Sequence, residues 1–135
     1  MAEKARKKIL VIEDEDSVVR LLKTILESAG YEVHAVRCGT TALACASDSN
    51  PALVILDLGL PDMDGYDVAK KLRQFFHPWS MPIVMLTGMD KPADQLRGFA
   101  HGADAYLTKP TNPDELLRTV ALLLGQPDEE LTGSG

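Results

Sequence analysis

Three short runs of this sequence are wholly apolar and rich in β-branched residues, and they constrain the fold more than any other feature. They are Ile9–Ile12, Leu53–Leu56 and Ile83–Leu86. A strand with one solvated face alternates apolar and polar residues, whereas a strand covered on both faces does not. The runs therefore predict central strands of a parallel sheet that is covered by helices on both faces.

The segments between and after these runs carry the marks of helices. Apolar residues recur at helical spacing from 18 to 29, and Gly30 follows as a stop signal. Further helices are predicted over 40–47, 66–76, 91–101 and 113–124, and weaker strands over 33–36 and 105–107. The expected inner faces are Val18, Leu21, Leu22, Ile25 and Ala29 in the first helix, and Leu96, Phe99 and Ala100 in the fourth.

The predicted order is a strand followed by a helix, repeated five times along the chain. Right-handed crossovers between parallel strands place the intervening helices on both faces of the sheet. The sequence therefore predicts the α/β class, as a doubly wound, five-stranded parallel sheet with five helices. In such sheets ligands bind beyond the carboxyl ends of the strands, so the residues just after each strand are the candidates for chemistry.

One domain is expected over residues 8–125. Residues 1–7 are basic and aperiodic and are interpreted as a leader, and residues 126–135 as a flexible C-terminal tail or linker stub. The net charge of −6 argues against direct binding of nucleic acid, which needs clustered Lys and Arg. No apolar run approaches the roughly 20 residues of a membrane span, so we expect a cytoplasmic protein without membrane contact. Cys38 and Cys45 are interpreted as buried, reduced thiols.

Polar side chains follow four of the predicted strands. Glu13 and Asp14 come after the first, Asp57 after the third, Thr87 after the fourth, and Lys109 shortly after the fifth. These residues are far apart along the chain, but the fold brings the carboxyl ends of parallel strands to one edge of the sheet. We therefore expect the five side chains to converge.

The chemistry of this set points to a phosphoryl group. Clustered carboxylates repel one another unless a cation offsets their charge, and a set of oxygen ligands favours Mg²⁺. Lys109 supplies a second positive charge and Thr87 a neutral hydroxyl. Together these groups suit a phosphoryl group bonded to the carboxylate of Asp57, with the cations offsetting its oxygens.

Four pieces of the sequence resemble the response-regulator receiver domain of two-component signalling. They are Glu13-Asp14, residues 56–65 (LDLGLPDMDG), residues 86–88 (LTG) and residues 106–110 (YLTKP). The resemblance extends over about residues 8–125, and it rests on four pieces that occur in the right order at the ends of the right strands. It implies the flavodoxin-like strand order 2-1-3-4-5.

The resemblance also implies a role for each residue at the strand ends. Asp57 is the implied phospho-acceptor, and Thr87 and Lys109 are the implied contacts of the phosphoryl group. Tyr106 is the implied switch aromatic, acting together with Thr87. The resemblance also implies a cis peptide bond between Lys109 and Pro110, whereas the sequence alone leaves trans as the default.

A bound Mg²⁺ is the cofactor that the resemblance implies. Its ligands would be Asp14 and Asp57 directly, Glu13 through water, and the main-chain carbonyl of Gly59. Many members of the family have Asp where this chain has Glu13, and the extra methylene would alter the metal affinity without abolishing it. Gly59 has no side chain to shield or steer a hydrolytic water, so the sequence leaves the lifetime of the phosphoryl group open.

The implied function is a phospho-accepting signalling switch. A sensor histidine kinase, a phosphotransfer domain or a small phosphodonor would supply the phosphoryl group. The surface of the fourth helix, fifth strand and fifth helix would then change, and a downstream effector domain or protein would bind there. Such a domain is not an enzyme and shows slow self-dephosphorylation at most.

Two other functions deserve comparison. A haloacid-dehalogenase-type phosphatase is the main alternative, because Asp14-Glu15-Asp16 has its D-x-D spacing after the first strand. Ser17-Val18 does not continue that motif, and no Asp pair follows the fourth strand. A flavodoxin-like electron carrier would need a hydroxyl- and glycine-rich loop after the first strand, where this chain has acids.

Overall fold

The computed structural model describes residues 6–77, 80–88 and 92–125, and its sheet has the predicted topology. All pairings between neighbouring strands are parallel, and the order is β2-β1-β3-β4-β5. The strands are β1 (Lys8–Ile12), β2 (Glu32–Val36), β3 (Leu53–Asp57), β4 (Ile83–Thr87) and β5 (Ala105–Thr108). The α/β class and the strand order 2-1-3-4-5 are therefore confirmed.

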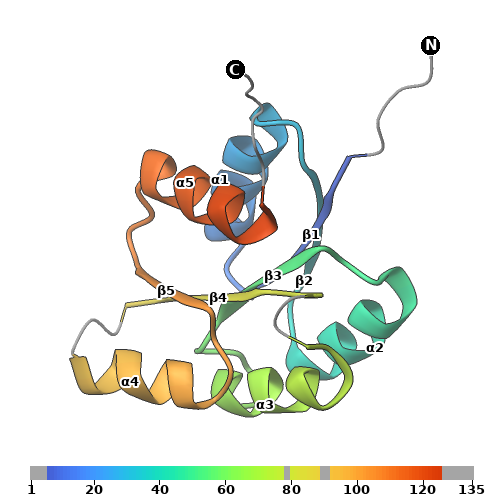
Figure 1. Cartoon of the computed structure of the whole chain (residues 1–135), viewed down its shortest axis with the longest axis vertical. Coiled ribbons are helices and arrows are strands. Elements are labelled where there is room, and N and C mark those ends of the chain that lie inside the picture. The colour runs from blue at the N-terminus through green and yellow to red at the C-terminus, as the bar shows by residue number, and fades with distance from the viewer. Residues whose placement is uncertain (1–5, 78–79, 89–91, 126–135) are drawn as a thin grey trace.

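Within these ranges five helices alternate with the strands. They are α1 (Asp16–Ser28), α2 (Gly39–Ser49), α3 (Gly65–Phe75), α4 (Pro92–Ala100) and α5 (Pro113–Leu124). In Figure 1, α1 and α5 cover one face of the sheet, and α2, α3 and α4 cover the other. Both faces are therefore covered, as the apolar runs predicted.

The core is divided by the sheet into two layers of buried side chains. Alternate residues of β1, β3 and β4 point to opposite faces. Those on the side of α2 and α3 are Leu10, Ile12, Val54, Leu56, Ile83 and Met85. Those on the side of α1 and α5 are Ile9, Val11, Leu53, Ile55, Val84 and Leu86. The three central strands are apolar throughout because each contributes to both layers.

The predicted inner face of α4 is wrong. Leu96 is 70% exposed, Phe99 is 46% exposed and Ala100 is also exposed, whereas Gly98 is buried. A Cβ atom built on Gly98 would lie 2.8 Å from Tyr106 Cδ2. The helix thus approaches the sheet through a residue without a side chain, which leaves its larger apolar residues on the outside.

The prediction for α1 is correct only in part. Leu22 and Ile25 are buried, but Leu21 and Ala29 are exposed, and Val19 and Leu26 are buried in addition. Two overlapping stripes have helical spacing in this segment, and packing on the sheet selects the one that includes Val19 and Leu26. Both cysteines are free thiols, as predicted, but they are half-buried rather than buried.

The observed boundaries of the helices and strands match the predicted ones within a few residues. Residues 1–5 of the predicted leader, Lys91 at the predicted start of the fourth helix and the predicted tail over 126–135 lie outside the described residues. Among the helices that are described, none is both long and apolar enough to span a bilayer.

Candidate functional site

Three carboxylates meet at the carboxyl ends of β1 and β3. These strands are neighbours in a register that pairs Ile12 with Leu56, so residues 13 and 57 leave the sheet at the same level. Glu13 is 1% exposed and Asp57 is 7% exposed, whereas Asp14 lies on the surface. One carboxylate oxygen from each of Glu13, Asp14 and Asp57 lies within 4.8 Å of the others.

Lys109 reaches this cluster from the loop after β5. Its Nζ lies 3.0 Å from Glu13 Oε1, donates a hydrogen bond of 3.2 Å to Asp57 Oδ1, and lies 3.9 Å from Glu15 Oε1. The backbone N–H of Lys109 donates to the carbonyl oxygen of Thr87 at 2.8 Å, which fixes the loop to the end of β4. The following peptide bond, to Pro110, is cis.

The neighbouring acids keep the ammonium group of Lys109 protonated. Burial alone would lower the pKa of its ammonium group, but the contact with Glu13 and the charge of Asp57 outweigh burial, so the pKa is raised. Lys109 therefore carries its positive charge at neutral pH, directly between two carboxylates.

Glu13 is the acid most disturbed by its surroundings. Burial is the main cause that raises its pKa, and the charge of Asp57 adds to it, whereas Lys109 and the Glu15 amide oppose it. Glu13 Oε2 accepts a hydrogen bond of 3.1 Å from that amide. Its Oε1 is buried and has Lys109 Nζ at 3.0 Å as an ion-pair partner, with no other partner in the part of the chain that the structure describes. This oxygen keeps a lone pair for a cation, so the donor set fits a hard divalent metal.

Replacing Glu13 with Gln is expected to raise the melting temperature by a few degrees at pH 7 in the presence of a chelator. A raised pKa means that the folded protein binds a proton more tightly than the unfolded chain does, so ionisation of Glu13 costs stability as pH rises above about 4.5. The gain should therefore shrink toward pH 4. Calorimetric melting at the two pH values measures this, and a lower melting temperature for Glu13→Gln at pH 7 would contradict it.

Gly59 lies close to the Asp57 carboxylate, and Thr87 lies at the end of the strand that neighbours β3. A Cβ atom on Gly59 would be 3.7 Å from Asp57 Oδ2, so the backbone of residue 59 passes beside the Asp57 carboxylate. Thr87 is buried at the end of β4. Because Met85 pairs with Tyr106 and strand residues alternate, the side chains of Thr87, Met85 and Tyr106 face the same side of the sheet, toward α4.

The loop between β3 and α3 is tied down at both of its ends. Asp62 accepts hydrogen bonds from Gly39 N at 2.7 Å, from Thr40 N at 3.0 Å and from Thr40 Oγ1 at 2.6 Å. These bonds, of which the Thr40 hydroxyl makes the largest contribution, lower the pKa of Asp62 to about 2. Gly65 packs on the other end of the loop, where a Cβ atom would lie 2.6 Å from Leu58 Cα. The loop that follows Asp57 is therefore held in place by hydrogen bonds to α2 and by packing at the start of α3.

The sequence missed the role of Asp62. The available signal was at the start of α2, where Cys38 occupies the N-cap position and its side chain caps nothing. A helix without a local cap needs hydrogen-bond acceptors from elsewhere in the chain.

Asp16 lies apart from the three carboxylates. It lies in the first turn of α1, where an acid is favoured by the helix dipole, and it forms an ion pair with Arg37. Its position is that of an acid that favours the start of a helix. Because Asp16 pairs with Arg37 outside the carboxylate cluster, it does not supply the second carboxylate that the D-x-D motif of a phosphatase requires.

Comparison with known proteins agrees with this geometry. The model of the response regulator receiver domain matches residues 9–121. The alkaline phosphatase synthesis transcriptional regulatory protein PhoP of Bacillus subtilis is 44% identical over 118 residues, which cover 87% of this chain and 48% of that protein. The transcriptional regulatory protein SrrA of Staphylococcus aureus is 43% identical over 116 residues, covering 86% of this chain and 47% of that protein. The chain thus spans about half the length of these regulators.

Solved structures show the same likeness. A putative response regulator from Chloroflexus aurantiacus superposes with a TM-score of 0.83 at 36% identity, and the match covers 90% of this chain and 100% of the other. The chemotaxis protein CheY4 of Vibrio cholerae superposes with a TM-score of 0.81 at 35% identity, covering 88% of this chain and 99% of the other. With the acidic pocket at the ends of β1 and β3, these matches show that the chain belongs to the response regulator receiver domains of two-component systems.

Proposed function

We propose that this receiver domain is a switch in which Asp57 accepts a phosphoryl group from the phospho-His of a sensor histidine kinase or phosphotransfer domain. The observation that carries the proposal is the position of Asp57. Its buried carboxylate lies at the end of a central strand, holds Lys109 at 3.2 Å, and has the carboxylates of Glu13 and Asp14 beside it.

The reaction is a transfer between two nucleophiles. A carboxylate oxygen of Asp57 attacks phosphorus and the bond from phosphorus to the donor imidazole nitrogen breaks; the donor ring, already protonated on its other nitrogen, leaves as neutral imidazole. The product is an acyl phosphate on Asp57. Lys109 donates to the phosphoryl oxygens as an ammonium group, and the hydroxyl of Thr87 is the proposed neutral donor.

Mg²⁺ is the metal that we propose for the acidic cluster. Asp14 and Asp57 would bind it directly, Glu13 through water, and Gly59 through its main-chain carbonyl. When bound, the ion offsets the negative charge of the carboxylates and of the incoming phosphoryl oxygens.

Asp14→Ala is expected to weaken Mg²⁺ binding by at least about tenfold, because it removes a direct ligand. Asp16→Ala is the matched control, since the carboxylate of Asp16 already pairs with Arg37 and lies outside the cluster. Titration calorimetry measures both. Equal effects of the two substitutions would contradict a direct role of Asp14 in binding the metal and would leave it as one more acid near the start of α1.

The acceptor proposal is tested by intact mass. The wild-type protein, incubated with Mg²⁺ and acetyl phosphate, should gain one phosphoryl group that is stable in acid and lost in alkali. A chelator should prevent the gain, because the carboxylates then repel the phosphodonor. No gain of mass in the presence of Mg²⁺ would refute the proposal.

The signal is proposed to leave the site through packing. A phosphoryl oxygen on Asp57 attracts the Thr87 hydroxyl, and Tyr106 on the adjacent β5 moves into the space behind it. The face made by α4, β5 and α5 then changes. This face carries the exposed apolar side chains Leu96, Phe99 and Leu122, which would bind a downstream effector domain or protein.

Thr87→Ala is expected to leave phosphorylation of Asp57 intact but to reduce the response of α4 to a minor fraction of the wild-type response. Hydrogen exchange of residues 93–106, with and without Mg²⁺ and beryllofluoride as phosphoryl mimic, measures the response. Thr24→Ala, an exposed position on α1, is the control. An α4 response of wild-type size in Thr87→Ala would contradict the route through Thr87.

We propose the cytoplasm as the place of this exchange, in keeping with the free thiols of Cys38 and Cys45. The two curated relatives are named as transcriptional regulators. Because this chain has a net charge of −6, we propose that any effect on transcription passes through an effector and involves no direct contact of this domain with nucleic acid.

A further inference from the structure

The stripe of α4 that contacts α3 is polar. Its apolar residues Leu96 and Phe99 face outward, and Gly98 meets the sheet. Asp94 and Arg97 of α4, with His101 just after it, recur at positions i, i+3 and i+7, which lie along one stripe of a helix. The contacts of this stripe decide what holds α4 in place.

All three members of the stripe contact Tyr66, a residue of α3 that is 3% exposed. The guanidinium carbon of Arg97 lies 4.2 Å from the centroid of the Tyr66 ring, and the His101 ring centroid lies 5.2 Å from it. The Tyr66 hydroxyl donates to the carbonyl oxygen of Asp94 at 3.5 Å. A cation over an aromatic face is a moderate attraction, so these contacts position α4 without locking it.

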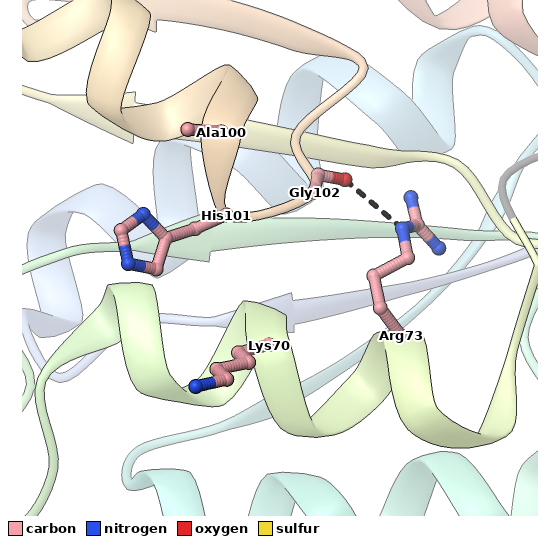
Figure 2. Close-up of a pocket in the computed structure, with 5 residues that line it drawn as sticks. All are labelled: Lys70, Arg73, Ala100, His101 and Gly102. Carbon is pink, nitrogen blue, oxygen red and sulfur yellow. Dashed lines mark hydrogen bonds between the residues drawn. The ribbon is translucent and has the colours of Figure 1, made fainter.

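The turn that follows the C-terminal end of α4 is anchored by Arg73 of α3. Figure 2 shows its guanidinium group beside the turn that follows α4, where Nε donates to the carbonyl oxygen of Gly102 at 3.0 Å. Arg73 also pairs with Asp104 at 2.5 Å. A cavity of about 330 Å³ lies between α3 and the end of α4, lined by Lys70, Arg73, Ala100, His101 and Gly102. The turn after α4 is therefore held to α3 by Arg73, beside an open hollow between the two helices.

Tyr66 is also connected to Asp57, through Gly65. It follows Gly65, on which a Cβ atom would lie 2.9 Å from the carbonyl oxygen of Asp57 and 2.6 Å from Leu58 Cα. Asp64, the N-cap of α3, accepts from Tyr66 N at 2.9 Å and lies 3.8 Å from Arg97 Nη2. No space separates the backbone of Asp57 from that of Gly65, so a shift at Asp57 displaces the start of α3.

We propose that Tyr66 is a positioning residue that transmits movement of the Asp57 loop to α4, on a route separate from Thr87 and Tyr106. The proposal rests on the proposed function, because it takes Asp57 as the site that changes. The route runs from the Asp57 backbone through Gly65 to the Tyr66 ring, and from there to Arg97 and His101. Each step is a contact in the structure.

The test uses amide chemical shifts of Leu96 and Phe99 on addition of Mg²⁺ and beryllofluoride. Wild type, Arg97→Met, Thr87→Ala and the double variant form a cycle. We expect Arg97→Met to reduce the shifts of α4, and the double variant to lose what remains in Thr87→Ala. Arg97→Lys keeps a cation over the ring and should retain most of the response.

Arg97 is exposed enough for its replacement to preserve the fold, and Arg20→Met on the surface of α1 is its control. Tyr66→Leu should act as Arg97→Met does, with Tyr31→Leu as control for the loss of a buried tyrosine in the opposite layer. Shifts at Asp14 and Asp57 with an α4 response that Arg97→Met leaves unchanged would overturn this coupling alone. Absence of shifts at Asp14 and Asp57 in the wild type would overturn the proposed function as well.

Discussion

Replacing Asp57 with Asn is expected to abolish phosphoryl uptake, with a loss of at least about 10³-fold in rate. The amide has nearly the same shape as the carboxylate, but its oxygen is a poor nucleophile and cannot form the acyl phosphate. The measurement is the intact mass of wild type and variant over time with Mg²⁺ and acetyl phosphate.

Asp48→Asn is the matched control for this experiment. Asp48 is an exposed acid on α2, so its replacement makes the same chemical change without touching the cluster. Its uptake should equal that of the wild type. Uptake by Asp57→Asn at the wild-type rate would place the acceptor elsewhere in the chain.

Lys109→Gln is expected to slow phosphoryl uptake by about 10²-fold, the usual cost of removing one charged or preorganised donor from a site where negative charge develops. Lys109 lies between Glu13 Oε1 and Asp57 Oδ1 at 3.0 and 3.2 Å. Glutamine keeps a hydrogen-bond donor but removes the positive charge, which leaves two buried carboxylates without a cation. The same mass time course measures the rate.

Lys71→Gln, on the exposed surface of α3, is the control for the loss of one positive charge. It should react as the wild type does. Uptake by Lys109→Gln within twofold of the wild type would mean that Lys109 merely neutralises the apo cluster and does not assist transfer.

The arrangement of the strands could be predicted because their apolar composition reflects burial on both faces of the sheet. Ile9–Ile12, Leu53–Leu56 and Ile83–Leu86 are buried on both faces, and only a central strand of a covered sheet has that environment. The inner face of α4 could not be predicted in the same way. Its contacts with Tyr66 and Tyr106 join residues that are distant in the sequence, and they favour a polar stripe and Gly98 over Leu96 and Phe99.

The same distinction holds for the site. Glu13, Asp14, Asp57 and Lys109 converge because each lies at or just after the carboxyl end of a strand of one parallel sheet, so topology alone brings them together. Asp62 was not predicted because its partners lie at the start of α2, and nothing in the local sequence says that the loop after β3 reaches them.

The most direct measurement of the central claim is the location of the phosphoryl group. Reduction of the phosphorylated protein with borohydride converts an aspartyl phosphate to homoserine, and peptide mass spectrometry then identifies the altered position. We expect homoserine at residue 57 and at no other aspartate, in a Mg²⁺-dependent amount. Homoserine at Asp14 or Asp62, or a phosphoryl group found on a histidine, would contradict the assignment of Asp57 as the acceptor.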